Sequence, residues 1–312
     1  MKAIPIILIV IMALLGVKLL SDEPSVLKEA DYLHIAHLGE GDSEGLVSVR
    51  QAFTERNPGY DLHFFAQIQK VSPAKTHRLA FVQRGGGTAQ FSNGESSKIS
   101  VGDIVHLPPQ RTMETDSLID YLVFTVPDPL PKEFPDFIRP DWDDNITDTP
   151  GGCVTATGAY RRILLTWKED VGPYVYHALN AHRVRITDSF THYHPVEGGF
   201  DEFYLVQMVQ PNAQLITSNQ VEKITNPESI KPEDVDNLLQ STKLKVGDLV
   251  YLPRGIVHRG VDGVLAQVIT IPGFIPGSEI GVDHHLHKIN ERFAQQPDLP
   301  LNQEASASAV IR

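Results

Sequence analysis

A decapeptide that occurs twice constrains the fold of this chain more than any other feature. Residues 99–108 read ISVGDIVHLP and residues 244–253 read LKVGDLVYLP, 145 positions further along, and eight of the ten positions are identical or exchange isoleucine for leucine. In each copy apolar residues alternate up to a Gly-Asp turn and resume in a short β-rich run that ends at proline. Such a duplication predicts two copies of one domain.

Short β-like stretches recur through the rest of the chain, and helical periodicity is scarce. This pattern predicts an all-β protein, built as an antiparallel sandwich or barrel repeated twice. Two segments are expected to be short helices: 232–240, which begins with Pro-Glu-Asp, and 283–294, with Asp283 as its N-cap. The β-like stretches are residues 62–71, 78–83, 118–126, 184–187, 203–209 and 264–271.

The two copies divide the 312 residues into four parts. Residues 1–21 hold a lysine followed by an apolar run, which predicts a signal peptide or an uncleaved N-terminal anchor, and hence export to the periplasm or the extracellular space. Residues 28–140 are expected to form an N-terminal barrel and residues 153–294 a C-terminal barrel, joined by an acidic, turn-rich linker. Residues 295–312 have little apolar content and predict a flexible tail.

The charge balance excludes one class of partner. The chain has 27 Lys and Arg against 39 Asp and Glu, a formal net charge of −12, so no basic field attracts nucleic acid. Contact with a membrane is expected only through the N-terminal segment. Cys153 is the single cysteine, so no intrachain disulfide can form.

The second copy carries residues with the spacing of a metal site. His192 and His194 are two apart, so on a strand both imidazoles can point into one cavity. Glu202 opens a β-like stretch shortly afterwards, and His258 follows the turn after the repeated strand. Three imidazoles and a carboxylate suit iron, manganese, cobalt, nickel or zinc, with one or two coordination positions left open.

These residues resemble the two motifs of the cupin superfamily, G(x5)HxH(x3-4)E(x6)G and G(x5)PxG(x2)H(x3)N. The first motif departs from the family pattern, because seven residues separate His194 from Glu202 and Glu197 is a competing ligand. Glu202 is preferred since a strand-like Phe-Tyr-Leu-Val follows it. The second motif fits at Gly247, Pro253, Gly255 and His258, with Asp262 where the family usually has asparagine.

The resemblance implies a bicupin, two tandem double-stranded β-helix (jelly-roll) barrels, with one divalent metal ion on His192, His194, Glu202 and His258. Iron or manganese is the first expectation, and zinc, nickel or cobalt the alternatives. The implied function is that of an oxidoreductase acting on a small oxygen-bearing molecule by dioxygenase-like or oxalate-type chemistry. The alternatives are a lyase or isomerase acting on a sugar or organic acid, and a non-catalytic ligand-binding protein. Association of barrels into a homo-oligomer is also common in the family.

The first copy lacks the corresponding ligands. Arg78 stands at the position of the ligand glutamate, Gln110 at that of the motif glycine and Met113 at that of the ligand histidine. We therefore expect no metal in the N-terminal barrel. His63, His77 and His106 could suggest a second site, but they are expected to be surface or hydrogen-bonded residues.

Two further features of the second copy are candidates for function. Arg254 and Arg259 flank the turn that carries His258, and Arg254 is the candidate to bind a carboxylate or phosphate of the substrate. Residues 210–243 form an insertion relative to the first copy, which suggests a lid or a subunit contact.

Overall fold

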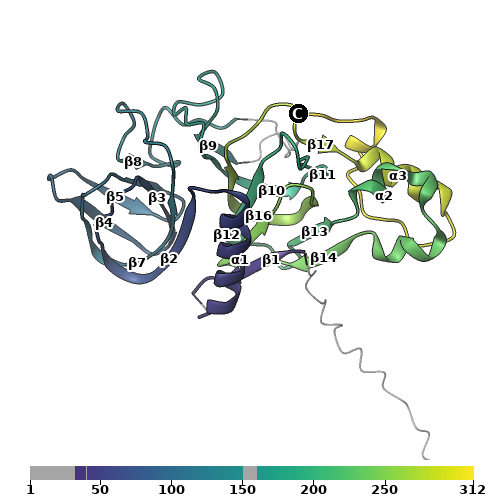
Figure 1. Cartoon of the computed structure of the whole chain (residues 1–312), viewed down its shortest axis with the longest axis horizontal. Coiled ribbons are helices and arrows are strands. Elements are labelled where there is room, and N and C mark those ends of the chain that lie inside the picture. Colours follow the sequence, from purple (N-terminus) through teal and green to yellow (C-terminus); the bar gives the residue numbers. More distant parts are fainter. Residues whose placement is uncertain (1–31, 40, 150–159) are drawn as a thin grey trace, which may run out of the picture.

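The computed structural model describes residues 32–39, 41–149 and 160–312, and within them the strands form two antiparallel sheets, each curled into a barrel. Figure 1 shows the first barrel on the left, helix α1 (Ser43–Arg56) beside the centre, and the second barrel in the middle of the molecule. This arrangement confirms the predicted all-β class. The expected export segment, residues 1–21, lies outside the described residues, as does Cys153.

Seven strands build the first sheet, in the order β5-β4-β7-β3-β6-β8, with β2 on β7. The strand β7 is the hub, because it pairs with β2, β3 and β4. Alternate residues of these strands point into an apolar barrel interior. The strands are β2 (Asp61–Val71), β3 (Arg78–Arg84), β4 (Gly86–Phe91), β5 (Ser96–Ser100), β6 (Ile104–Leu107), β7 (Met113–Thr125) and β8 (Phe137–Ile138).

Ten strands of the described residues build the second sheet, with the path β1-β15-β12-β16-β10-β9. The long strand β16 pairs with β10, β11, β12 and β13 and so ties this barrel together. The strands are β1 (His34–His37), β9 (Arg161–Leu165), β10 (Asn180–Asp188), β11 (His192–Tyr193), β12 (Asp201–Val209), β13 (Gln214–Ser218), β14 (Gln240–Lys243), β15 (Asp248–Leu252), β16 (Val257–Ile271) and β17 (Ile280–Gly281).

The N-terminal strand departs from the predicted domain boundary. Residues 34–37 fall in the segment 28–140 assigned to the first barrel, but β1 pairs antiparallel with β15 of the second sheet. The pairing covers what would otherwise be an open edge of β15, and an open edge leaves backbone N–H and C=O groups without partners. The helix α1 then carries the chain back to the first barrel.

The repeated decapeptides adopt the same turn. Gly102 and Gly247 have φ of 100° and 95°, a region that favours glycine. The carboxylates of Asp103 and Asp248 each accept a hydrogen bond from the backbone N–H three residues earlier, at 2.8 Å in both copies. The Gly-Asp pair is therefore present in both copies because the turn between the two strands needs both residues.

The barrels share an apolar core with α1. Phe53 of α1 is fully buried, and its ring lies 5.9 Å from that of Phe124 in the first barrel and 5.1 Å from that of Phe203 in the second. Residues of β3 and β12 that point away from their own barrel interiors join this cluster, so each sheet is apolar on both faces here.

A group of short helices packs against one side of the second barrel, at the right of Figure 1. The predicted helix 283–294 is confirmed as α3 (Asp283–Arg292), whereas 232–240 forms a shorter 3-10 helix, Pro232–Asn237. Asp283 is not the N-cap. It lies in the first turn, and its carboxylate accepts hydrogen bonds from Thr191 and from the backbone N–H of Asn302. The remaining helices are α2 (Val221–Thr225) and the 3-10 helices Pro227–Ser229 and Ala305–Ala307.

The prediction of a flexible tail at 295–312 is wrong. Leu299 and Leu301 are buried in the apolar cluster of the helices. Further on, Ile311 forms a β-bridge with Ile280, and Arg312 exchanges backbone hydrogen bonds with Glu279. The leucines of this segment thus reach the apolar cluster of the helices, a contact that composition alone does not reveal. No helix in the described ranges is long and apolar enough to cross a membrane.

Candidate metal centre

Two paired strands bring the three predicted histidine ligands together. His192 lies on β11, His194 follows directly after it, and His258 lies on β16 opposite His192 in the strand register. One ring nitrogen of each lies within 4.8 Å of those of the other two. Among the described residues this is the only group of three or more histidines, cysteines or acids at such spacing.

A backbone carbonyl beside each imidazole fixes the orientation of the ring. Because a carbonyl oxygen only accepts hydrogen bonds, each Nδ1 must carry the proton and donate it, which leaves the lone pair on Nε2. This arrangement is the one that metal-binding histidines use. The Nδ1 atoms of His192, His194 and His258 lie 3.1, 3.1 and 3.0 Å from the backbone oxygens of Phe190, Phe200 and Ile256, respectively.

The three Nε2 atoms point at one another in the interior of the barrel. Each is buried. Within the described part of the chain, those of His192 and His194 make no hydrogen bond, and that of His258 faces the Glu202 carboxylate. A buried polar atom without a partner costs about 1–3 kcal/mol, so this group of imidazoles is unfavourable unless a ligand satisfies it. A divalent metal ion accepts three lone pairs at once, and the residues present therefore fit such an ion.

Glu202 supplies the carboxylate beside these imidazoles. It lies on β12 with its side chain buried, and its carboxylate oxygens lie 3.3 Å from His258 Nε2 and 4.0 Å from His194 Nε2. Glu197, the competing candidate, is exposed in the loop between His194 and β12. The structure therefore brings Glu202 to the histidines and leaves Glu197 outside.

The protonation of the site follows from burial and neighbouring charge. Burial lowers the pKa of His192 and His194 well below the usual value, and the adjacent imidazoles lower the pKa further. Burial also lowers the pKa of His258, but the Glu202 carboxylate opposes it and the pKa ends up raised. His192 and His194 are thus neutral, the form in which histidine binds a metal.

Sequence reasoning missed a second carboxylate at the site. Glu279 precedes β17, and its carboxylate lies 3.8 Å from His192 Nε2. Burial and repulsion by Glu202 raise the pKa of Glu279 to about 7, against the attraction of Arg161 and Arg312. Glu279 lies outside both motifs. The only sequence signal for it is that it is an acidic residue in an apolar C-terminal stretch.

A cavity of about 420 Å³ opens beside the carboxylates. Strands of the second sheet line it, together with residues of the segment 274–279 and residue 312. This volume is at the lower end of the range for small-molecule sites. The residues that line it include Arg161, Ile163, Leu165, Trp167, Asn180, His182, Glu202, Thr270, Phe274, Glu279 and Arg312.

The structure does not bring Arg254 to this cavity. Its side chain donates to Asp201, a fully buried carboxylate, at 2.8 Å, and Arg254 N donates to the same carboxylate at 2.8 Å. Tyr251 and Asn57 also donate to Asp201, so this network fixes the turn before His258 from outside the barrel. Arg259 pairs with Asp188 and also points away from the site.

The residues at the ligand positions of the first barrel, and its other histidines, make other contacts. Met113 is buried in the apolar interior of the barrel, and Arg78 donates to a backbone carbonyl. His77 Nδ1 lies 2.9 Å from His106 Nε2, and the two rings stack. His63 contacts the carboxylate of its neighbour Asp61.

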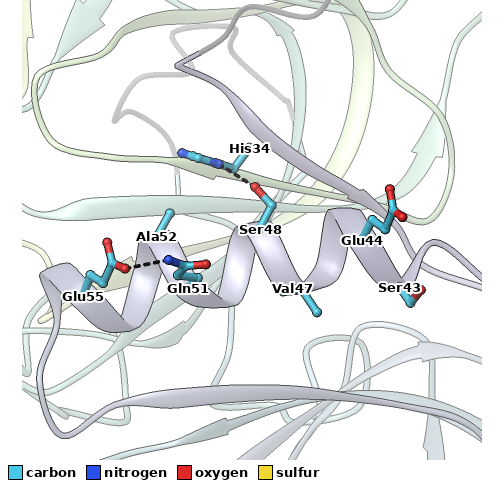
Figure 2. Close-up of a pocket in the computed structure, with 8 residues that line it drawn as sticks. All are labelled: His34, Ser43, Glu44, Val47, Ser48, Gln51, Ala52 and Glu55. Carbon is cyan, nitrogen blue, oxygen red and sulfur yellow. Dashed lines mark hydrogen bonds between the residues drawn. The ribbon is translucent and has the colours of Figure 1, made fainter.

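A second groove, of about 630 Å³, runs along α1 and is shown in Figure 2. Its one imidazole, His34, is tied to Ser48 by a hydrogen bond of 2.9 Å, and Gln51 donates to Glu55. The groove is open, and no cluster of possible metal ligands lines it among the described residues. It lacks the convergent polar groups of the barrel site.

No family model and no curated protein matches the sequence. Solved structures of cupin-fold proteins do match at low identity. Vicilin from hazelnut, Corylus avellana, is 12% identical over 80% of this chain and 85% of its own, with a TM-score of 0.44. Procruciferin, an 11S globulin from Brassica napus, is 11% identical over 83% and 88%, with a TM-score of 0.45. Salicylate 1,2-dioxygenase from Pseudoaminobacter salicylatoxidans is 13% identical over 68% and 70%, with a TM-score of 0.41. At these values the likenesses carry no statement about activity.

Proposed function

We propose that this chain is a metal-dependent enzyme of the oxidoreductase class that acts on a small oxygen-bearing molecule in the second barrel. The observation that carries the proposal is the convergence of the three buried Nε2 atoms of His192, His194 and His258, each oriented by a backbone carbonyl. The resemblance of the sequence motifs to those of cupins supports the same conclusion. Fold alone does not supply it, because one fold hosts many functions.

The residues of the chain have distinct tasks in this proposal. The three imidazoles and Glu202 would hold an iron or manganese ion, which supplies activation of O2 or polarisation of a substrate oxygen when bound. Glu202 also places a negative charge beside the ion. The cavity orients the substrate toward the open side of the site, and its apolar wall excludes water from the reacting groups.

The proposal includes export of the protein through residues 1–21. Cell fractionation tests this part of the proposal.

Oxygen uptake tests the reaction class. Protein reconstituted with Fe(II) is mixed with a panel of small carboxylic acids, phenols and sugars, and O2 consumption is followed with an electrode. At least one compound is expected to drive uptake, and His192→Ala is expected to abolish it. The control His63→Ala removes an exposed imidazole of the first barrel and should leave uptake unchanged. Turnover of any compound without O2 consumption contradicts the oxidoreductase class.

A lyase or isomerase acting on a sugar or organic acid is the second candidate, and Glu279 is the observation that favours it. Its carboxylate faces the cavity beside His192 without belonging to the histidine group, so it can exchange a proton with a substrate. Solvent-deuterium incorporation into substrate or product, lost in Glu279→Gln, would identify this chemistry. If no compound is converted with any metal, the barrel is a non-catalytic binding module.

A further inference from the structure

We propose that the first barrel binds a small monocarboxylate on Arg78, at the place that corresponds to the metal centre of the second barrel. The site lies outside the second barrel and does not require the metal ion. It is therefore a further binding site, beyond the proposed function.

The strand register places Arg78 where the second barrel has Glu202. The residues that pair with the two side chains are 145 positions apart, which is the offset of the repeated decapeptide. They are Leu107 and Thr125 for Arg78, and Leu252 and Thr270 for Glu202. Arg78 thus stands at the position of a metal ligand, on the face of β3 that holds the interior residues Ala80 and Val82.

Small residues stand at the positions of two ligand histidines. The backbone N–H of Gln110 donates to Ala74 O at 2.9 Å, as that of Gly255 donates to His194 O at 2.7 Å in the second barrel. This bond matches Ala74 with His194, and Ser72, two residues earlier, with the first ligand histidine. Ser72 is exposed and its backbone oxygen contacts Arg78, so a small ligand can reach the guanidinium from this side.

The guanidinium of Arg78 has no counter-charge among the described residues. The side chain is 9% exposed. Within the described ranges its Nη2 donates to Ser72 O at 2.7 Å, and its Nε is buried without a hydrogen-bond partner. Burial lowers the pKa of Arg78, and no carboxylate in the described part of the chain opposes this shift.

Two carboxylates of the same barrel, Asp136 and Glu95, pair with Arg111 instead. A buried charge is unfavourable unless a counter-charge or hydrogen bonds replace the lost water. An anion bound to Arg78 would supply both a counter-charge and an acceptor for Nε.

The surroundings of Arg78 favour a monocarboxylate over anions of higher charge. A guanidinium is planar, and its parallel N–H donors match the spacing of two carboxylate oxygens. One arginine balances one negative charge, whereas sulfate would retain an unpaired charge beside an apolar interior. That interior includes the buried side chains of Val71, Leu107 and Met113. The methyl group of acetate suits such neighbours.

Acetate is the probe for this site. Full-length protein is treated with a chelator, so that no metal ion can bind the probe, and is titrated in a calorimeter in a buffer free of carboxylates. Acetate is expected to bind at least about tenfold more tightly than sulfate or than acetamide, which lacks the charge. Equal or tighter binding of either compound would overturn the proposed class of ligand.

Variants locate the carboxylate. Arg78→Met is expected to weaken acetate binding at least about tenfold, and Arg78→Lys, which keeps the charge without the planar fork, about threefold. Arg185→Met is the matched control: it removes the same charge from the exposed face of β10, and affinity should not change. An acetate affinity that is undetectable in wild type, or unchanged in Arg78→Met, refutes the site.

Urea unfolding separates loss of the site from loss of the fold. Without acetate, Arg78→Met is expected to unfold at the same urea concentration as wild type or at a higher one, because an apolar side chain replaces a buried charge without a counter-ion. Acetate should raise the midpoint of wild type and leave that of Arg78→Met unchanged. An equal rise in both proteins contradicts the site. Both proteins should bind metal alike, so this result stands apart from the test of the metal centre.

Discussion

Acidifying the metal-free protein from about pH 7.5 to about pH 5.5 is expected to lower its free energy of unfolding by about 3 kcal/mol through His192 and His194 alone. Burial lowers the pKa of both imidazoles well below the usual value. The unfolded chain binds a proton at each of them near pH 6.5, whereas the folded chain does not. Stability is therefore fully present above that pH and falls as the pH decreases.

The magnitude follows from proton linkage. Each imidazole that protonates only in the unfolded state contributes a slope of about 1.4 kcal/mol per pH unit below its unfolded pKa. Over this range one such group contributes about 1.4 kcal/mol, so the two together contribute roughly 3 kcal/mol. His258 is not counted, because the Glu202 carboxylate raises its pKa.

Urea unfolding of chelator-treated protein at the two pH values measures the effect. Other groups titrate in the same range, so the informative quantity is the difference between wild type and the double variant His192→Gln/His194→Gln. The variant should lose about 3 kcal/mol less than wild type on acidification. If both proteins lose the same amount, the two imidazoles are not buried and neutral, and the reasoning about the site fails.

Three further predictions concern the fold and the site. Gly247→Ala should destabilise the protein by about 1–3 kcal/mol in urea unfolding, because φ is 95° and a Cβ would lie 2.8 Å from a backbone oxygen. Gly277→Ala, with positive φ but open space around it, should cost less. Phe53→Ala should cost about 3–5 kcal/mol, since its ring contacts both barrels, and a loss below 1 kcal/mol would contradict the shared core. Zinc at 100 times its Kd should stabilise wild type by about 2.7 kcal/mol in the same assay but leave His258→Ala unchanged.

The repeat predicted the strands and turns of the barrels because these depend on residues that are neighbours in the sequence. The Gly-Asp turns need positive φ and a side-chain acceptor, and both requirements are visible in the residues themselves. Alternation along each strand then determines which side chains point inward. The spacing of His192 and His194 placed both on one face for the same reason, and the structure pairs His192 with His258 on the neighbouring strand.

The features that the sequence did not predict depend on contacts between residues far apart in the chain. The strand β1 joins the second sheet because β15 offers an edge, and edges are created only once the whole sheet is formed. Arg312 reaches the cavity at the end of the segment 295–312, whose composition predicted a flexible tail, and Glu279 reaches it from outside both motifs. Arg254 lies next to the ligand turn in sequence, but its side chain reaches Asp201 on the outer side of the barrel.

The metal content of protein purified from its native compartment tests the central claim most directly. Elemental analysis is expected to find about one equivalent of a divalent transition metal in wild type and in the control His63→Ala, and almost none in His192→Ala or His258→Ala. Equal metal in wild type and in the two ligand variants would contradict the metal centre.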